Sequence, residues 1–522
     1  MNAEYVMALD AGTGSCRAIL FDSAGRQIAA AAREWVNSEV PSAPGSQQFS
    51  TSDNWQLICD CIHECLATGS AEARSVKAVA ATSMREGIVL YDRHGREIWA
   101  CPNADARAGE QASRLIGNGA AQRIYEISGD WVSITSTPRL LWLAEHEPDL
   151  LRSVRHLGML SDWINYRLCG EFCTEPSAGS SSGMFDLAAR TWSPEIVAIS
   201  GLAPEILPEV LPCGSVLGKV TAVAAEETGL APGTPVVLGG ADTQVGLHGL
   251  AAAPGEITII GGTFWQQTAL TRQPIIDPKA RLRTLCHVSD DEWMIEGIGF
   301  YSGLALRWFR DAFCRDLVIK ARADGQDPYR LIEAEAATAP PGSDGVIPIF
   351  GNVMKASNWT HAAPSFLQFD LTRPETGRAA CARALLEHAA YTSLAHVEIL
   401  GKLTGRACAS IRFAGGASAG TLWPQILADV LGCPVITAPI SEASAYGTML
   451  LAARGIGVPA GTVPMPQDRE YLPNLELRAS YQESYARWAA VNAALLQLTE
   501  SLDLQPLWRA PGGRPGNQTA EK

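Results

Sequence analysis

Three short runs of strand-forming residues open the chain, and turn residues separate each from the next. Residues 5–10 and 17–21 lie on either side of the glycine-rich segment 11–15, and a second turn at residues 22–25 leads to a third run at 27–34. Strand runs joined by short glycine-containing segments are typical of β-hairpins. The pattern predicts an antiparallel three-stranded meander at the start of the chain.

Helical and strand-like patterns then alternate. Residues 54–67 predict an amphipathic helix, with Trp55, Ile58 and Ile62 on its apolar stripe. Further helices are predicted at residues 139–147, 161–168, 304–313, 383–400 and 422–431. Further strands are predicted at residues 76–82, 88–91, 97–99, 235–238, 255–263 and 410–416. This order of elements indicates an α/β fold.

The pairing of a strand with a glycine-rich turn recurs in both halves of the chain, after residues 235–238, 255–260 and 410–414. We therefore expect two related α/β domains that face a central cleft, formed by residues 1–250 and 251–509. The segment 510–522 is polar and rich in Gly and Pro, which is typical of disorder, so we expect a disordered tail there.

Composition narrows the function classes. The 522 residues carry 41 Lys and Arg against 55 Asp and Glu, a net charge of −14, which argues against binding to nucleic acid or anionic membranes. No run reaches the ~18 apolar residues of a membrane span, and the first residues lack a basic leader. The 13 cysteines include no CxxC pair, and we interpret Cys59, Cys61 and Cys65 as buried thiols rather than zinc ligands. These features predict a cytoplasmic protein.

The hairpin turn after Asp10 carries the first candidate chemistry. Its backbone N–H groups and the hydroxyls of Thr13 and Ser15 could donate to phosphate oxygens, and Asp10 could hold Mg²⁺ through water. The alternative is a plain hairpin turn that needs glycine. The segment lacks the Gly-Lys-Ser/Thr of a P-loop, and it leads into a strand rather than a dinucleotide-binding helix.

Later strand ends carry further glycines and polar residues. Gly262-Thr263 and Gly415-Gly416 each follow an apolar strand, and Gly303 precedes a helix; open α/β sheets bind ligands at such turns, although each could also be a simple loop. Arg85-Glu86 follows another strand and suits hydroxyl recognition, with a surface ion pair as the alternative. Asp242 ends a buried strand, where it could be a catalytic base or a helix cap.

These residues together resemble the FGGY family of carbohydrate kinases, along nearly the whole chain from Asp10 to about Leu451. The resemblance rests on the motif of residues 10–17, Arg85-Glu86, residues 161–170, Asp242, Gly262-Thr263, Gly415-Gly416 and residues 442–447. It implies two actin-like (ribonuclease H-like) ATPase domains facing a cleft, and ATP and Mg²⁺ as cofactors.

The resemblance also implies a role for each matching residue. Asp242 is the expected base, and Asp10 the expected Mg²⁺ ligand. The expected substrate residues are Arg85, Glu86, Asn103, Asp105, Asp242 and Gln244, and the expected nucleotide residues are Thr13, Gly14, Ser15, Arg17, Gly262, Thr263, Gly303, Gly415, Gly416 and Ala417. Ala417 and Ala419 depart from the family pattern, in which a third Gly and a Lys are expected.

Within the family, residues 83–91, 98–101, 262–267, 307–314 and 361–366 resemble the subfamily that phosphorylates autoinducer-2 in its linear 4,5-dihydroxypentane-2,3-dione form. A kinase of a pentulose or related sugar is the alternative acceptor, and an actin-like ATPase without phosphate transfer is the alternative class. The resemblance allows a sugar-uptake phosphocarrier protein as regulator and a homodimer, and no surface motif tests either.

Overall fold

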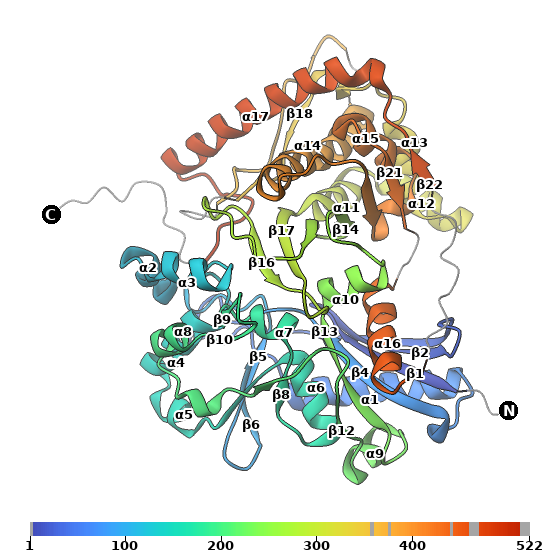
Figure 1. Cartoon of the computed structure of the whole chain (residues 1–522). Coiled ribbons are helices and arrows are strands. Elements are labelled where there is room, and N and C mark those ends of the chain that lie inside the picture. Colours follow the sequence, from blue (N-terminus) through green and yellow to red (C-terminus); the bar gives the residue numbers. More distant parts are fainter. Residues whose placement is uncertain (1–3, 355–359, 374–376, 439–441, 459–468, 512–522) are drawn as a thin grey trace.

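The computed structural model describes residues 4–354, 360–373, 377–438, 442–458 and 469–511. Two mixed β-sheets form the cores of two domains, which lie one above the other in Figure 1. The first domain contains the N-terminal meander, and the second contains most of the chain after residue 256. No helix of the described ranges is long and apolar enough to cross a membrane.

The first sheet has six strands in the order β12-β13-β4-β1-β2-β3. The strands are β1 (Tyr5–Ala11), β2 (Ser15–Asp22), β3 (Gln27–Glu34), β4 (Val76–Ser83), β12 (Val216–Lys219) and β13 (Pro235–Ala241). The meander β1–β3 is antiparallel, whereas β4 runs parallel to both β1 and β13. The carboxyl ends of β1, β4 and β13 therefore meet at one edge of the sheet.

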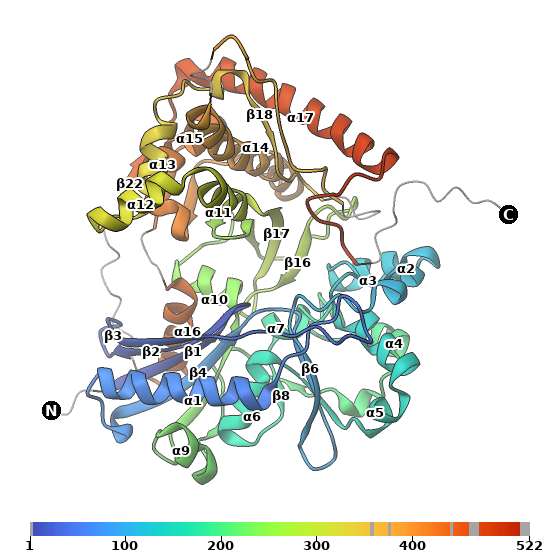
Figure 2. The ribbon, with the colours of Figure 1, turned by 180° about the vertical axis from the view of Figure 1, so that it is seen from behind.

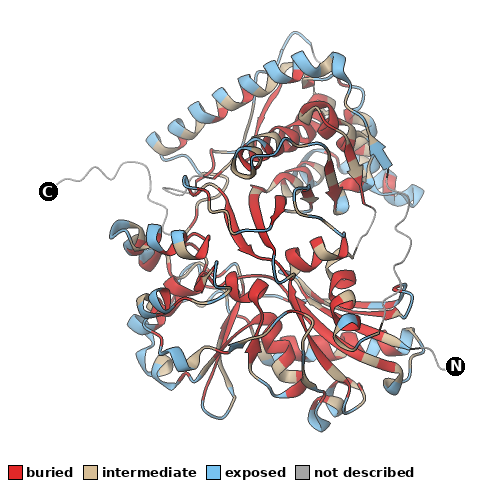
Figure 3. Ribbon diagram, in the orientation of Figure 1, coloured by how far each residue is buried: buried red, intermediate tan, exposed pale blue. Residues whose placement is uncertain are grey.

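Alternating residues of β1 bury against opposite layers, as the two-residue period of a strand requires. Met7 and Leu9 pack in the cluster that contains α1 (Thr51–Thr68) and α6 (Leu160–Cys169). Val6 and Ala8 pack with α16 (Ala443–Gly455), which comes from the far end of the sequence. The sheet is thus covered on both faces, and its central strands β1 and β4 are nearly all buried (Figure 3).

The second sheet has the order β16-β17-β15-β14-β20-β21-β22. Its strands are β14 (Ile257–Gly261), β15 (Trp265–Thr271), β16 (Arg283–Cys286), β17 (Trp293–Phe300), β20 (Ile411–Ala414), β21 (Val435–Thr437) and β22 (Arg469–Tyr471). The helices of this domain are α11 (Ser302–Phe313), α12 (Arg315–Asp324), α13 (Pro328–Ala336), α14 (Arg378–Thr404), α15 (Leu422–Leu431) and α17 (Arg478–Ser501). Helix α14 is buried along most of its length, while α17 runs along the outside (Figures 1 and 3).

A smaller layer extends the first domain around the sheet β6-β5-β7, formed by β5 (Ile88–Tyr91), β6 (Glu97–Cys101) and β7 (His156–Met159). The surrounding helices are α2 (Gly109–Gly117), α3 (Ala120–Ser128), α4 (Ser136–His146), α5 (Pro148–Ser153), α7 (Pro176–Ser180) and α8 (Pro194–Ser200). Helix α9 (Ala222–Thr228) packs instead in the cluster of α1 and α6 on the first sheet. The two-stranded pairs are β8 (Cys173–Thr174) with β11 (Glu209–Val210), β9 (Phe185–Asp186) with β10 (Thr191–Trp192), and β18 (Ile347–Ile349) with β19 (Ser365–Leu367).

The junction of the domains is built by α16 and α10 (Asp242–Gly249). The two helices approach so closely that a Cβ on Gly447 would lie 1.8 Å from the carbonyl oxygen of Val245. Only glycine permits this backbone contact. Residue 250, where the sequence predicts the domain boundary, lies between α10 and β14, yet α16 crosses back to cover the first sheet.

The structure confirms the α/β class, the N-terminal meander and the predicted helices and strands, with ends shifted by a few residues. Cys59, Cys61 and Cys65 are buried in α1, as predicted. Ala510, the first residue of the predicted tail, is buried, and the disorder of the tail stays a prediction. The remainder of that tail, residues 512–522, lies outside the described residues.

Candidate active site

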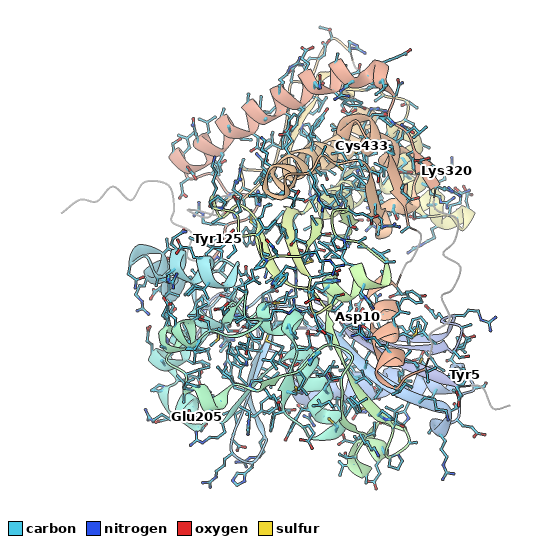
Figure 4. The ribbon with its side chains drawn as sticks, in the orientation of Figure 1. Tyr5, Asp10, Tyr125, Glu205, Lys320 and Cys433 are labelled. Atoms are coloured by element: carbon cyan, nitrogen blue, oxygen red, sulfur yellow. The ribbon has the colours of Figure 1, made fainter. Side chains whose placement is uncertain are left out.

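Three strand ends of the first sheet bring the predicted acidic and basic residues together. Asp10 pairs in register with Thr82 on β4, and Ala241 on β13 pairs with Ser83. Arg85 follows β4 by two residues, and Asp242 directly follows β13 as the first residue of α10. Asp10 lies where the two domains meet (Figure 4). The parallel register therefore places both aspartates and Arg85 on one sheet edge facing the second domain.

The two aspartates influence each other electrostatically. Burial and the nearby charge of Asp242 raise the pKa of Asp10 to about 7, against a smaller opposing effect of Arg17. Burial also raises the pKa of Asp242, although Arg85 lowers it. The Asp242 carboxylate accepts a hydrogen bond from the backbone N–H of Thr243, 2.6 Å away. A divalent cation bound between these two half-buried carboxylates would offset the repulsion of their charges.

A cavity of about 220 Å³ opens beside Asp242. One part of its lining is charged or polar and the other is apolar and aromatic. Its lining residues are Thr13, Arg85, Glu86, Asn103, Asp130, Trp131, Ser133, Ile134, Thr135, Asp242, Phe264, Gln266, Arg283, Ile298, Phe300, Met354 and Trp508. The size and the mixed lining suit one small polar molecule with an apolar end.

A buried network of charges forms the polar wall. Arg85 donates two hydrogen bonds to Glu296 on β17, at 2.7 and 3.1 Å. Arg283 on β16 donates to both Glu86 and Asp130. All five side chains are at least nine-tenths buried. The network links loops of the first domain to strands of the second sheet, because β16 and β17 extend to the cavity.

Arg139 holds the loops that carry this wall. Its guanidinium is almost fully buried and donates to the backbone carbonyls of Glu86, Pro102, Asn103 and Asp105, at 2.6 to 3.3 Å. Glu86 itself has a φ of 61°, a strained conformation for a residue other than glycine. We conclude that Arg139 acts through the backbone and keeps Glu86 and Asn103 at the cavity.

A second cavity, of about 400 Å³, lies in the second domain. Its lining residues are Gly261, Gly262, Thr263, Gly303, Leu306, Arg307, Asp327, Tyr329, Arg330, Glu333, Gly416, Ala417, Ala419, Gly420 and Trp423. Thr263 lines this cavity, whereas the next residue, Phe264, lines the smaller one. The turn at residues 262–264 therefore lies between the two cavities, where a group could pass from one ligand to the other.

Close packing shapes this turn. A Cβ on Gly303 would lie 1.9 Å from the carbonyl oxygen of Gly262, so only glycine lets the start of α11 approach the turn. Arg307, one turn further along α11, donates to the hydroxyl of Thr263 at 2.9 Å. The turn is held by α11 at both its backbone and its Thr263 side chain.

The predicted site residues divide into those at the cavities and those away from them. Thr13, Arg85, Glu86, Asn103 and Asp242 line the small cavity, and Gly262, Thr263, Gly303, Gly416 and Ala417 line the large one. Asp10, Gly14, Ser15 and Arg17 belong to the β1–β2 hairpin. Gly415, at the end of β20, precedes the large cavity without lining it.

Three predicted residues have other partners in this structure. The buried carboxylate of Asp105 is paired with Arg107, and Asp105 does not line the cavity. Gln244 is buried and donates weakly to the carbonyl of Cys286, at 3.4 Å. Arg17 forms an ion pair with Glu442 at 2.7 Å. To bind a phosphate, Arg17 would have to exchange this carboxylate for the phosphate oxygens.

The sequence analysis missed several residues at the cavities. Asp130 and Arg283 complete the polar wall, and Trp508 and Met354 belong to the apolar part of the lining. Glu296 does not line the cavity but pairs with Arg85, which does. The available signal was weak: Arg283 and Glu296 are single charged residues within otherwise apolar strands, and such residues need a buried partner. Residues of α13, including Tyr329 and Glu333, line the large cavity and carried no motif.

Comparison with known proteins identifies the family to which this site belongs. Residues 5–249 match the N-terminal domain of the FGGY family of carbohydrate kinases, and residues 258–456 match its C-terminal domain. The chain belongs to the FGGY family of carbohydrate kinases. It is therefore a phosphotransferase with an alcohol group as acceptor, and ATP is the phosphate donor implied for the family.

Similar FGGY proteins fall into two sets. Proteins named autoinducer-2 kinase from Yersinia enterocolitica and Yersinia pseudotuberculosis are 44% identical over 520 residues, which is 98% of this chain and of theirs. Among solved structures, a xylulose kinase from Rhodospirillum rubrum has a TM-score of 0.83 at 26% identity, covering 95% of this chain and 99% of that one. A Plasmodium falciparum glycerol kinase with ADP has a TM-score of 0.81 at 16% identity, covering 94% and 98%. The fold is the two-domain fold of FGGY sugar kinases.

Proposed function

We propose that this kinase transfers the γ-phosphate of ATP to the terminal (carbon-5) hydroxyl of autoinducer-2 in its linear 4,5-dihydroxypentane-2,3-dione form. The observation that carries the proposal is the similarity to proteins named autoinducer-2 kinase, which extends over 98% of both chains. Because the similarity covers nearly the full length of both chains, neither an added nor a missing domain distinguishes this chain from those proteins. The product is phospho-autoinducer-2.

The small cavity supports an acceptor of this kind. The linear dione has five carbon atoms in its chain, with two adjacent hydroxyls at one end and two carbonyls toward the other. Arg85 and Arg283 can donate hydrogen bonds to its oxygens, and Glu86 can accept from a hydroxyl. The Nε–H of Arg283 is buried without a hydrogen-bond partner among the described residues, so it is a candidate donor to a carbonyl oxygen.

Asp242 is the proposed base. The acceptor oxygen attacks the γ-phosphorus, the bond from that phosphorus to the β–γ bridging oxygen breaks, and ADP leaves. The hydroxyl proton passes to the Asp242 carboxylate late in this step, because a carboxylate is too weak a base to remove it in advance. The hydrogen bond from the backbone N–H of Thr243 fixes the orientation of the carboxylate. Transfer thus depends on positioning more than on covalent chemistry.

The large cavity is the proposed nucleotide site. Gly416 and Ala417 would lie along the adenosine, and Thr263 with the β1–β2 hairpin would contact the phosphates. Asp10 would hold Mg²⁺, whose charge neutralises the phosphates during transfer. The half-buried position of Asp10, within the electrostatic influence of Asp242, fits a cation there. Ala417 and Ala419, where the chain departs from the family pattern, both line this cavity.

The experiment that tests the class is product analysis with ATP, Mg²⁺ and the dione. A kinase yields an organic phosphate whose mass is that of the dione plus one phosphoryl group, with one ADP for each product. Inorganic phosphate as the sole phosphate product would instead favour an actin-like ATPase. Phosphorus NMR coupling to the carbon-5 protons then identifies the phosphorylated hydroxyl.

The cytoplasmic location, the homodimer and the phosphocarrier regulator stay predictions. Size-exclusion chromatography of the purified chain, alone and mixed with a sugar-uptake phosphocarrier protein, checks the last two. A complex would elute earlier than either component, and an unchanged elution volume would count against it.

A further inference from the structure

The apolar wall of the small cavity is largely aromatic, and one of its aromatic residues, Trp508, comes from the C-terminal segment. Trp508 and Phe300 pack with ring centroids 4.3 Å apart, and Phe264 packs against Phe300 at 5.7 Å. Ile298 and Met354 extend the same wall. The wall therefore combines β17, the 262–264 turn, a loop and the C-terminal segment, which are far apart in sequence.

Backbone pairing holds Trp508 in place. Its carbonyl oxygen accepts a hydrogen bond from the N–H of His361 at 2.9 Å, and the N–H of Leu507 donates to Ala362 at 3.2 Å. Thr360 and Arg509 form an antiparallel bridge beside them. The C-terminal segment is thus held by strand-like backbone hydrogen bonds, and the Trp508 side chain forms part of the cavity wall.

The family domains match residues 5–249 and 258–456, so this C-terminal segment lies outside both ranges. After α17 ends at Ser501, the chain runs down from the second domain toward the first (Figure 2). Because this segment lies beyond the domains that family members share, the part of the wall that it forms can differ between members. Such a difference can give them different acceptors.

The cavity lining combines two kinds of chemistry. Arg85, Glu86, Asp130 and Arg283 are its charged residues, and Phe300 and Trp508, whose rings pack together, belong to its apolar residues. An acceptor whose reacting hydroxyl lies at Asp242 directs its opposite end along this cavity. An apolar wall offers no partner to a hydroxyl at that end, and a buried unpaired hydroxyl costs free energy.

We propose that Trp508 is a specificity-determining residue that contacts the methyl end of the acceptor and selects against acceptors with a hydroxymethyl group there. The inference rests on the proposed function, because the dione carries a methyl ketone where a pentulose carries a hydroxymethyl ketone. Trp508 takes no part in phosphate transfer itself.

The test compares two acceptors that differ by one hydroxyl, 1-deoxy-D-xylulose and D-xylulose, together with the dione. The full-length wild type should prefer the deoxy sugar about 10- to 100-fold in kcat/KM, the range in which apolar pockets discriminate. Trp508→Ala should narrow this ratio to about threefold or less, while the KM for ATP stays unchanged. Trp508→Phe should keep most of the preference.

Leu504→Ala is the matched control, since Leu504 lies in the same segment and is exposed, and it should leave the ratio unchanged. Equal losses on both sugars in Trp508→Ala, or a wild type that does not distinguish them, would overturn the inference. If Trp508→Ala does not fold, Trp508→Gln provides the second variant, and it should shift the ratio toward D-xylulose. Failure of the wild type on the dione would instead overturn the proposed function.

Discussion

Arg85 and Glu296 form a buried ion pair, with 2.7 Å between Nη1 and Oε2. Arg85 follows the central strand of the first sheet, and Glu296 lies on β17 of the second sheet. The charges of Glu296 and Glu86 keep the pKa of Arg85 above its usual range, against the effect of burial. This pair connects the two domains at the wall of the acceptor cavity.

Glu296→Gln should destabilise the protein and weaken acceptor binding. Removing one partner of a buried pair typically costs about 3–5 kcal/mol. Glu86 remains near Arg85, at 3.9 Å, so we expect a loss toward the lower end of this range. The amide keeps the shape of the side chain, so the loss reports the charge. Thermal unfolding and the acceptor KM measure the two effects. Glu483→Gln, in the exposed ion pair with Arg487 on α17, is the control and should change neither quantity. An unchanged melting temperature in Glu296→Gln would contradict this account of the pair.

Asp242→Asn should lower kcat by orders of magnitude while the KM for ATP stays within about threefold of the wild type. The amide preserves the volume and the hydrogen bond from Thr243, but it cannot accept the acceptor's proton. Steady-state kinetics with an ADP-coupled assay measures both constants. Near-normal kcat in this variant would remove Asp242 from the role of base.

Gly303→Ala should raise the KM for ATP and lower thermal stability. Its added methyl group would collide with the carbonyl oxygen of Gly262, so the turn between the two cavities has to move. Gly416→Ala is the control for stability, because an added Cβ there meets no atom within 4 Å. If both variants melt at the wild-type temperature, the packing of α11 against the turn does not need glycine.

The sequence predicted the elements whose signal is local. The hairpin after Asp10 was predicted because strand runs flank glycines, and Arg85 and Asp242 because each ends a strand next to the cavity. The partners of these residues could not be predicted in the same way. Glu296 is 211 positions from Arg85, and only the register of two sheets brings them together.

The same limit applies to residues with several local interpretations. Asp105 was predicted to bind substrate; in this structure its carboxylate pairs with Arg107 and does not line the cavity, and its role stays a prediction. Trp508 carried no local signal, because its place at the cavity depends on the chain returning past Thr360–Ala362. Local patterns predict elements and strand-end residues, whereas side chains supplied by distant segments require the fold.

The stability of the protein should depend on pH through Asp162, in α6 and away from the cavities. Burial raises the pKa of Asp162 to about 8, against the opposing hydrogen bond from the N–H of Met159. In the unfolded chain its pKa returns to about 3.9. The folded state therefore binds the proton more strongly, and its stabilising contribution is full below about pH 4 and is lost as the pH rises to about 8.

Asp162→Asn removes this titration. The melting temperature of the wild type minus that of the variant should decrease as the pH rises from 5 to 8, since the asparagine does not ionise. Differential scanning calorimetry at several pH values measures the difference. A difference that stays constant or increases with pH would contradict the raised pKa of Asp162.

The central claim is that the acceptor is the linear dione. The most direct measurement compares kcat/KM for 4,5-dihydroxypentane-2,3-dione, D-xylulose, D-ribulose and glycerol, with ATP and Mg²⁺ saturating and each product confirmed by mass. We expect the dione to exceed every other acceptor by at least about tenfold. A ketose that equals or exceeds the dione would contradict the proposed acceptor, while leaving the FGGY fold and the role of Asp242 in place.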